Sequence, residues 1–371
     1  MNLRPKKKIV LLGMMSRHPV AGMVWLTMQY LIGFERLGHE VFYVERYGTP
    51  AFIDSVLRRF DLGHRWVVHD DEGCHGLSGD EARRLYDSVA LIINLHGGTK
   101  PLPEHVATGR LVYLETDPVE LEIDLYDGAS GSMAFVAKHN AFFTWAENYG
   151  HPDCRVPLPD GFQFRPTRQP VVVDLWESRG VAGGERFTTI GNWRQLYREV
   201  AFQGEVYHWS KHYEFLKFIG LPSRTGQAFE LALASYDEAD RQMLESKGWK
   251  VRPAATLSTD VDAYRDYVCG SRGEFTVAKD QYSRMRTGWF SDRSASYLAA
   301  GRPVVTQETG FSNVLPTGQG LFAFSSLEEI VDAVDSINSA YEKHCRAARE
   351  IALEYFSYDV VLPRLLAEAG V

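Results

Sequence analysis

The chain has 371 residues, enough for two or three domains that each bury a core of their own. Its formal net charge of −8 argues against a protein whose main partner is nucleic-acid phosphate, but leaves room for a local basic pocket. Four cysteines, at positions 74, 154, 269 and 345, lie far apart in the sequence, so we expect free thiols and no cysteine-based metal site.

The N-terminal segment MNLRPKKKIVLLGMM combines a basic start with a short apolar run. The run is broken by SRHP and no small-residue cleavage pattern follows, so we predict a first β-strand rather than a signal peptide. No apolar segment approaches the length of a membrane span. We therefore expect a cytoplasmic protein.

Short β-branched and aromatic runs alternate with longer periodic segments in the first half of the chain, which is typical of parallel βαβ units. Strands are expected at residues 8–13, 41–45, 89–97, 111–117 and 141–147. Between the first two, apolar residues recur at helical spacing and Gly38 is a fitting helix stop. This pattern predicts a Rossmann-like domain over residues 1–165.

The amino-acid composition changes after this domain. Residues 155–185 contain several prolines, an apolar patch and a glycine pair, which indicates a linker that we place at 166–185. A second alternating series predicts strands at 187–193, 229–235, 249–254, 274–279, 303–307 and 321–326, and helices at about 260–268, 289–300, 326–352 and 358–369. We expect a second Rossmann-like domain over 186–355 and a final helix over 356–371.

Two such domains in tandem form a cleft between the carboxyl ends of their strands, where these folds bind ligands. Three first-domain loops would reach it: one holds His18 and Gly22, one begins with His96, and one contains Asp117. The histidines and the carboxylate are candidate bases. A solvated or structural histidine and a turn-forming aspartate remain open as alternatives.

In the second domain, basic side chains follow the first strand. Arg194 and Lys211 could neutralise a diphosphate, although scattered basic residues are also common on an ordinary surface. The helix expected at 289–300 has Ser291, Asp292 and Arg293 in its first turn. Free backbone N–H groups and the positive end of the helix dipole suit a phosphate there.

Several segments resemble one enzyme family. AGMVWLTMQYLIGFERLGHEV looks like the segment that opens many nucleotide-sugar transferases, and ASYLAAGRPVVTQETGF looks like their donor-domain segment ending in G-x-P-V-V. Together with GNWR and HWSKHYEFLKF, they resemble GT-B glycosyltransferases over essentially the whole chain, and in particular a poorly characterised bacterial group. The resemblance implies an α/β fold class with two Rossmann-like domains facing across a cleft, and a C-terminal helix that crosses back to the first.

The resemblance also implies an activity. The protein would move a sugar from a nucleotide-diphosphate sugar, bound by the C-terminal domain, to a hydroxyl-bearing acceptor bound by the N-terminal domain, without a metal or other cofactor. His18, His96 and Asp117 are the candidate catalytic residues. The residues expected to bind the nucleotide-sugar and its diphosphate are Gly22, Gly191, Asn192, Arg194, Ser210, Lys211, Arg286, Ser291, Asp292, Arg293, Gln307, Glu308, Thr309 and Gly310.

The chain departs from the family in its acidic residues. Family 4 retaining enzymes carry two glutamates that flank the donor, and the corresponding places here hold Gly288 and Ser296. Family 1 inverting enzymes carry a histidine in the first loop, and His18 lies near that place in a different register. The sequence therefore leaves the stereochemistry of transfer open.

Two other hypotheses keep the same fold. A nucleotide-sugar epimerase or hydrolase would convert the nucleotide-sugar with no acceptor present. A non-catalytic partner subunit, suggested by the missing glutamates, would bind the nucleotide-sugar without turnover. For a transferase, the acidic balance favours a small-molecule acceptor over nucleic acid. The sugar, the base, the acceptor and the oligomeric state are left open.

Overall fold

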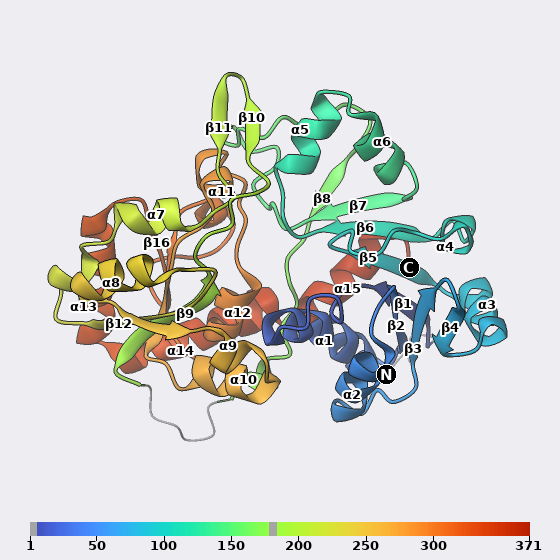
Figure 1. Cartoon of the computed structure of the whole chain (residues 1–371), viewed down its shortest axis with the longest axis horizontal. Helices are drawn as coiled ribbons and strands as arrows, with labels where there is room; N and C mark the ends of the chain where they lie inside the picture. The colour runs from blue at the N-terminus through green and yellow to red at the C-terminus, as the bar shows by residue number, and fades with distance from the viewer. Residues whose placement is uncertain (1–5, 178–183) are drawn as a thin grey trace.

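Two largely parallel sheets lie side by side, each flanked by helices (Figure 1). The structure is a computed structural model that describes residues 6–177 and 184–371. Within those residues the first sheet has the strand order β4-β3-β2-β1-β5-β6-β7-β8, and the second has the order β13-β12-β9-β14-β15-β16. The two tandem Rossmann-like domains expected from the sequence are confirmed.

The first sheet is built around β1, which pairs in parallel with β2 and β5. Its strands are β1 (Lys8–Leu12), β2 (Glu40–Arg46), β3 (Trp66–Asp70), β4 (Gly73–Gly76), β5 (Leu91–Leu95), β6 (Leu111–Glu115), β7 (Ala141–Thr144) and β8 (Phe164–Pro166). The helices of this domain are α1 (Ala21–Arg36), α2 (Pro50–Arg59), α3 (Gly79–Ser88), α4 (Pro103–Ala107), α5 (Glu120–Tyr126) and α6 (Ser130–Val136).

Successive residues of β1 are buried on opposite faces of this sheet. Ile9 and Leu11 belong to the core cluster that includes residues of α1, whereas Val10 and Leu12 belong to the cluster that includes residues of α3. A strand covered on both faces is apolar at every position, because neighbouring side chains point to opposite sides. This burial explains the unbroken apolar run in the sequence.

The second sheet is built around β9. Its strands are β9 (Arg186–Asn192), β12 (Ala228–Ala234), β13 (Lys250–Pro253), β14 (Gly273–Thr276), β15 (Val304–Gln307) and β16 (Leu321–Phe324). The helices are α7 (His212–Lys217), α8 (Glu238–Ser246), α9 (Ala255–Ser258), α10 (Val261–Cys269), α11 (Asp280–Arg284), α12 (Asp292–Ala299), α13 (Leu327–Ser339) and α14 (Tyr341–Ile351). Single helical turns lie at Val173–Trp176, Leu221–Ser223, Phe311–Asn313 and Ala352–Phe356.

Three details differ from the sequence predictions. The single helix expected at 326–352 is wrong, because Ala340 has non-helical angles (φ −145°, ψ 47°) and separates α13 from α14. The helix expected from 289 begins only at Asp292. Two antiparallel hairpins were not expected: β3–β4, and β10 (Val200–Phe202) with β11 (Glu205–Tyr207).

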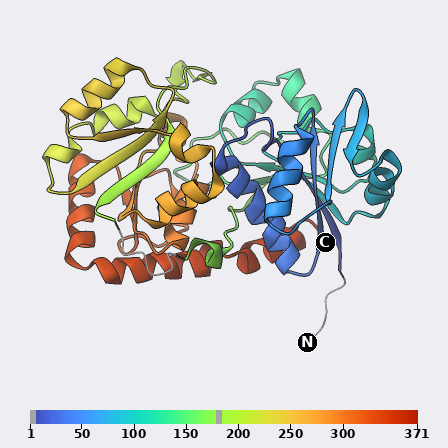
Figure 2. The ribbon, with the colours of Figure 1, turned by 60° about the horizontal axis from the view of Figure 1, so that its bottom comes forward.

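The last helix, α15 (Tyr358–Glu368), crosses back to the first domain (Figure 2), as expected. It lies against α1 at Gly33, where an added Cβ would come within 2.6 Å of Leu362 and 2.9 Å of Tyr358. Leu362, Leu365 and Leu366 complete the first domain's core. In the described part of the chain, no helix is both long enough and apolar enough to cross a membrane.

Candidate functional site

A cavity of about 340 Å³ lies between the two domains, lined by loops that follow strands of both sheets. The first domain contributes Met14, Gly22, Met23, Leu26, His96, Thr116, Asp117 and Trp145. The second contributes Gly191, Asn192, Gln195, Trp209, Lys211, Lys279, Trp289, Ser291, Asp292 and Arg293. We call this cavity the cleft. It occupies the place where paired α/β domains bind ligands.

A second hollow of about 240 Å³ adjoins the cleft. The two share Gly22, Gly191, Asn192, Asp292 and Arg293. The rest of the second hollow is mostly apolar, lined by Val20, Ile190, Ala234, Ala254, Ser258 and Tyr264. Together they form one groove with a polar end and an apolar end, which suits a ligand with a charged part and a flat ring system.

A larger hollow, about 620 Å³, lies elsewhere, between α3 and α4 at the outer edge of the first domain. Its charged lining residues Arg83, Asp87, Glu104 and Arg110 are exposed, and no lining residue comes from the second domain. Size alone does not make it the better candidate, because the cleft collects strand-end residues and buried charges from two domains.

Lys211 is a cleft lysine with no ion-pair partner among the described residues, although the charges of Glu274 and Asp292 act on it from farther away. Its ammonium lies 5.8 Å from the centre of the Trp289 ring, and it makes no ion pair or hydrogen bond within the described residues. Burial, together with the charges of Arg293 and Lys279, holds the pKa of Lys211 well below its usual value. An anion beside Lys211 would relieve both effects.

The start of α12 forms the floor of the same region. Arg293 is held rigidly: its Nε donates to Glu274 (2.6 Å) and its terminal nitrogens donate to Ile190 O (2.8 Å) and Thr276 Oγ1 (2.9 Å). Ser291, the N-cap residue, makes no side-chain capping bond. Burial raises the pKa of Asp292. A helix start of this kind favours an anionic ligand.

Asp117 and Lys279 join the two domains across the cleft. Lys279 Nζ donates to Asp117 Oδ1 (2.9 Å), and the hydroxyl of Tyr282 donates to the same oxygen (2.5 Å). Burial works to raise the pKa of Asp117, but the charge of Lys279 and the bond from Tyr282 lower it to about 2. Burial lowers the pKa of Lys279 to about 8, against the opposing charge of Asp117. Asp117 is therefore ionised and paired at neutral pH.

His96 lies on the first-domain side. Its Nδ1 is 2.6 Å from Thr116 Oγ1, and its buried Nε2 has no hydrogen-bond partner in the part of the chain that the structure describes. Burial lowers the pKa of His96 to about 4, so the imidazole is neutral at pH 7. Its backbone has φ +62°, an uncommon conformation for a non-glycine residue and one that recurs at functional sites. A neutral imidazole with one free nitrogen can accept a proton.

The structure brings together part of the predicted site. The predicted residues that line the cleft are Gly22, His96, Asp117, Gly191, Asn192, Lys211, Ser291, Asp292 and Arg293. The remaining ones, which do not line it, are His18, Arg194, Ser210, Arg286, Gln307, Glu308, Thr309 and Gly310. Their roles stay predictions, and their positions are as follows.

Two of the predicted arginines are bound to carboxylates outside the cleft. Arg194 makes a two-pronged contact with Asp240 (2.5 and 2.8 Å), and Arg286 Nε donates to Asp153 (2.6 Å). Ser210 is buried and its hydroxyl bonds within its own loop. His18 is exposed. None of these four side chains lines the cleft, so the diphosphate-binding roles of Arg194, Arg286 and Ser210 and the catalytic role of His18 stay predictions.

The loop after β15 is also tied to protein groups. Gln307 Nε2 donates to Glu214 (2.7 Å), and Thr309 Oγ1 donates to Trp289 O (2.6 Å). Glu308 accepts from the backbone N–H of Gly310. Of the predicted binding residues in the α12–β15 segment, those at the start of α12 line the cleft and those in this loop do not.

The structure explains the missing family glutamates. Gly288 has φ +81°, and an added Cβ would lie 2.3 Å from the backbone nitrogen of Asn148 in the first domain. No side chain fits there while the domains are in contact. Ser296, one turn into α12, donates its hydroxyl to Asp292 O (3.0 Å). The carboxyl group nearest these places in the sequence is that of Asp292.

Sequence reasoning missed several lining residues, chiefly Lys279 and the indoles of Trp145, Trp209 and Trp289. Lys279 had a usable signal, because it is the last residue of the expected strand at 274–279. No group of three or more metal-binding side chains was found in the residues described, and the expectation that the reaction needs no metal stays a prediction.

Comparisons with known proteins address the fold. No protein-family model matches the sequence, and no curated protein resembles it in sequence. Among solved structures, AviGT4, a glycosyltransferase involved in avilamycin A biosynthesis, aligns over 98% of this chain and 97% of its own, with 13% identity and a TM-score of 0.57. HepE from Anabaena, solved with UDP-glucose, covers 98% of both chains with 13% identity and a TM-score of 0.57.

An α-glucosyltransferase in complex with UDP and a 13-mer DNA aligns over 99% of this chain and 100% of its own, at 10% identity and a TM-score of 0.58. All three similarities extend over essentially complete chains, so the shared fold includes both domains. Identities this low establish the fold rather than the reaction. The chain has the two-domain GT-B fold of glycosyltransferases.

Proposed function

We propose that this protein is a glycosyltransferase that moves a sugar from a nucleotide-diphosphate sugar to the hydroxyl group of an acceptor. The observation that carries the proposal is Lys211, a lysine with no ion-pair partner among the described residues, beside the start of α12 in the cleft of a GT-B fold. This is the arrangement that a diphosphate requires. The adjoining apolar hollow would hold the nucleoside.

In this proposal the bond between the anomeric carbon and the diphosphate oxygen breaks, and its electron pair goes to the diphosphate. Lys211 and the N–H groups at the start of α12 stabilise the charge that develops there. The acceptor oxygen bonds to the anomeric carbon, and its proton passes to Nε2 of His96. Asp117 is better suited to orienting a hydroxyl, because its carboxylate already accepts bonds from Lys279 and Tyr282.

We further propose that the reaction proceeds without a metal, since Lys211 supplies the positive charge opposite the diphosphate. A small-molecule acceptor is supported by the modest cleft and its three indole rings. A cytoplasmic location is supported by the four cysteines, which are all free.

The test is a thermal-stability screen with UDP, dTDP, GDP and ADP. One diphosphate at a hundredfold excess over its dissociation constant should stabilise the protein by about 2.7 kcal/mol. Lys211→Met should weaken that ligand by at least about tenfold. The matched control, Lys247→Met, removes an exposed cation outside the cleft and should leave affinity unchanged.

Stabilisation by none of the four nucleotides would overturn the proposal. Turnover of a nucleotide-sugar without an acceptor would favour the epimerase or hydrolase, and binding without any turnover would favour the non-catalytic partner subunit. Transfer that survives EDTA treatment would support the metal-independent mechanism.

A further inference from the structure

An inserted segment stands beside the mouth of the cleft. Between β9 and α7, residues 194–210 form what we call the arm, which contains the β10–β11 hairpin. Figure 1 shows this hairpin projecting next to α11 of its own domain and α5 of the other. The arm begins where Asn192 ends β9 in the cleft, and returns to the cleft at Trp209 and Lys211.

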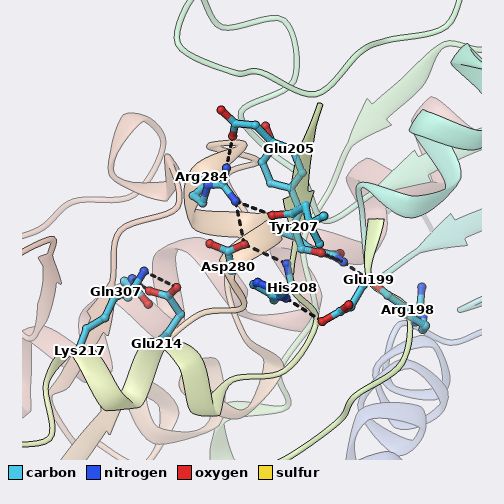
Figure 3. A network of polar contacts seen from close by, with 12 residues as sticks. Arg198, Glu199, Glu205, Tyr207, His208, Glu214, Lys217, Asp280, Arg284 and Gln307 are labelled. Atoms are coloured by element: carbon cyan, nitrogen blue, oxygen red, sulfur yellow. Dashed lines mark hydrogen bonds and ion pairs between the residues drawn. The ribbon is translucent and has the colours of Figure 1, made fainter. Parts of the chain in front are cut away.

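The arm is fastened to α11 through its backbone. Gln281 Nε2 donates to Arg198 O (2.7 Å), Arg284 donates to Val206 O (2.8 Å), and the N–H of His208 donates to Asp280 (2.9 Å). Figure 3 shows Arg284 and Asp280 lying among the hairpin residues. The arm and α11 therefore form one unit, directly after Lys279.

The arm also contacts the first domain. Arg198 forms an ion pair with Glu120 at the start of α5, and the Phe202 ring packs edge-on against Tyr126 with centroids 5.7 Å apart. Contacts on both sides give the end of the arm a defined position relative to both domains. A residue held this way can place a functional group accurately in the cleft.

Trp209 is the residue of the arm that lines the cleft. Its ring lies between two cations, with the Arg198 guanidinium carbon 3.8 Å and Lys279 Nζ 2.9 Å from the ring centre. The side chain is 4% exposed and lines the cleft. Its indole N–H has no hydrogen-bond partner among residues 6–177 and 184–371. A buried indole N–H is normally paired, so this donor is available to a ligand.

The groups around Trp209 indicate which ligand atom would accept this bond. Asp117 is an ionised carboxylate bound to Lys279, and it would repel an anionic ligand. A hydroxyl group fits better, because it can accept from the indole N–H while donating to a carboxylate. The anionic diphosphate belongs instead at Lys211, which has no such carboxylate partner.

We infer that Trp209 is a specificity-determining residue whose indole N–H donates to a hydroxyl of the transferred sugar. The inference rests on the proposed function. The inference goes beyond the proposed function by assigning the arm a role. The arm and α11 position one hydrogen-bond donor for the sugar, separately from the groups that hold the nucleotide.

The experiment compares Trp209→Phe with wild type by calorimetry. Phe keeps an aromatic ring between Arg198 and Lys279 but lacks the N–H group. The probes are UDP, dTDP, GDP and ADP and the glucose, galactose and mannose conjugate of each. The variant should bind its best nucleoside diphosphate within twofold of wild type, and the corresponding best sugar conjugate about tenfold more weakly.

Deoxy analogues of that conjugate identify the hydroxyl. One analogue should bind wild type about tenfold more weakly than the parent conjugate and should lose nothing further in Trp209→Phe. Trp249→Phe is the control, because Trp249 Nε1 donates to Ile219 O (2.8 Å) in the second domain's core, away from the cleft. It should leave the preference for conjugate over diphosphate unchanged.

The outcomes separate the two proposals. If diphosphates and conjugates bind but Trp209→Phe weakens both equally, or neither, Trp209 has only a structural role and the inference is wrong while the proposed function stands. If none of the nucleotides or conjugates binds wild type, the proposed function and this inference fall together.

Discussion

At the scale of single residues, the polar groups of the cleft fall into two kinds. Arg293 and Lys279 are neutralised by protein carboxylates, whereas Lys211, Nε2 of His96 and the Trp209 N–H have no hydrogen-bonding or ionic partner in the described structure. Buried polar groups are normally paired within a protein, so unpaired groups that also line the cleft are the ones we propose to contact a ligand. The paired ones hold the frame in place.

His96 gives a prediction at this scale. His96→Asn should lower kcat by about 10²- to 10⁴-fold, because the proton acceptor is lost, while nucleotide affinity stays within twofold. Asn is chosen because it tolerates the positive φ of this position. The measurement is steady-state kinetics together with nucleotide titration.

The pH profile provides the control for His96. With a pKa of about 4, His96 is in its proton-accepting form above about pH 5, so wild-type kcat should change little through this group from pH 6 to 8 and fall below pH 5. The acid limb should be absent from the residual activity of His96→Asn. An unchanged kcat in the variant would remove His96 from the mechanism.

At the scale of elements, the sequence predicted what local pattern determines. The apolar runs gave the strands, and the start of α12 was placed within a few residues because its first-turn polar residues precede a small-residue helix. The ion pairs of Arg194 with Asp240 and of Arg286 with Asp153 could not be predicted, because each partner comes from a remote segment that spacing cannot reveal.

The arm was missed although it had a local signal. VAF and EVY flank Gln203 and Gly204, both of which adopt positive φ (51° and 80°), as a two-residue hairpin turn requires. Two short runs with such a dipeptide between them predict a hairpin. What no local pattern could show is that Arg198 and Phe202 of the arm contact α5 of the other domain.

The packing of α15 on α1 gives the prediction at this scale. Gly33→Ala should destabilise the protein by about 1–2 kcal/mol net. The new methyl group would overlap Leu362 and Tyr358, and the cost of this overlap exceeds the stability gained from the higher helix propensity of alanine. Urea unfolding followed by far-ultraviolet circular dichroism measures the change.

Gly131→Ala is the matched control. Gly131 lies in α6, and an added Cβ there would meet nothing within 4 Å. This substitution should be neutral or stabilise by up to about 1 kcal/mol through helix propensity. If Gly33→Ala behaved the same way, α15 would not be docked as the structure shows.

At the scale of the whole molecule, the domains meet through contacts on both sides of the cleft. Trp25 Nε1 donates to Val261 O (2.8 Å), and Trp289 Nε1 donates to Thr116 O (2.8 Å). Gly288 and Asn148 form a third close contact between the domains. None of these pairs is adjacent in sequence, which is why the sequence could place two domains and a cleft but not the groups that meet across it.

The interdomain pair of Asp117 and Lys279 carries the last prediction. Asp117→Asn should lower the free energy of unfolding by about 2 kcal/mol at pH 7. The loss is smaller than for a fully buried pair, because the Asp117 side chain is 38% exposed while that of Lys279 is 11% exposed. Glu120→Gln, which removes the more exposed ion pair with Arg198, is the control and should change stability by less than about 1 kcal/mol.

The sign of the pH dependence distinguishes the two pairs further. The pKa of Asp117 is about 2 in the folded protein against an ordinary value of 3.8, so its stabilising effect is present above about pH 4 and is lost as the pH falls towards 2. The stability difference between wild type and Asp117→Asn should therefore be constant from pH 5 to 7 and shrink below pH 4. Moderate salt should reduce the small effect of Glu120→Gln but leave most of the Asp117 effect, because screening acts mainly on exposed charges. Equal losses in the two variants, or a difference that does not change with acid, would mean that the Asp117–Lys279 pair does not hold the domains together.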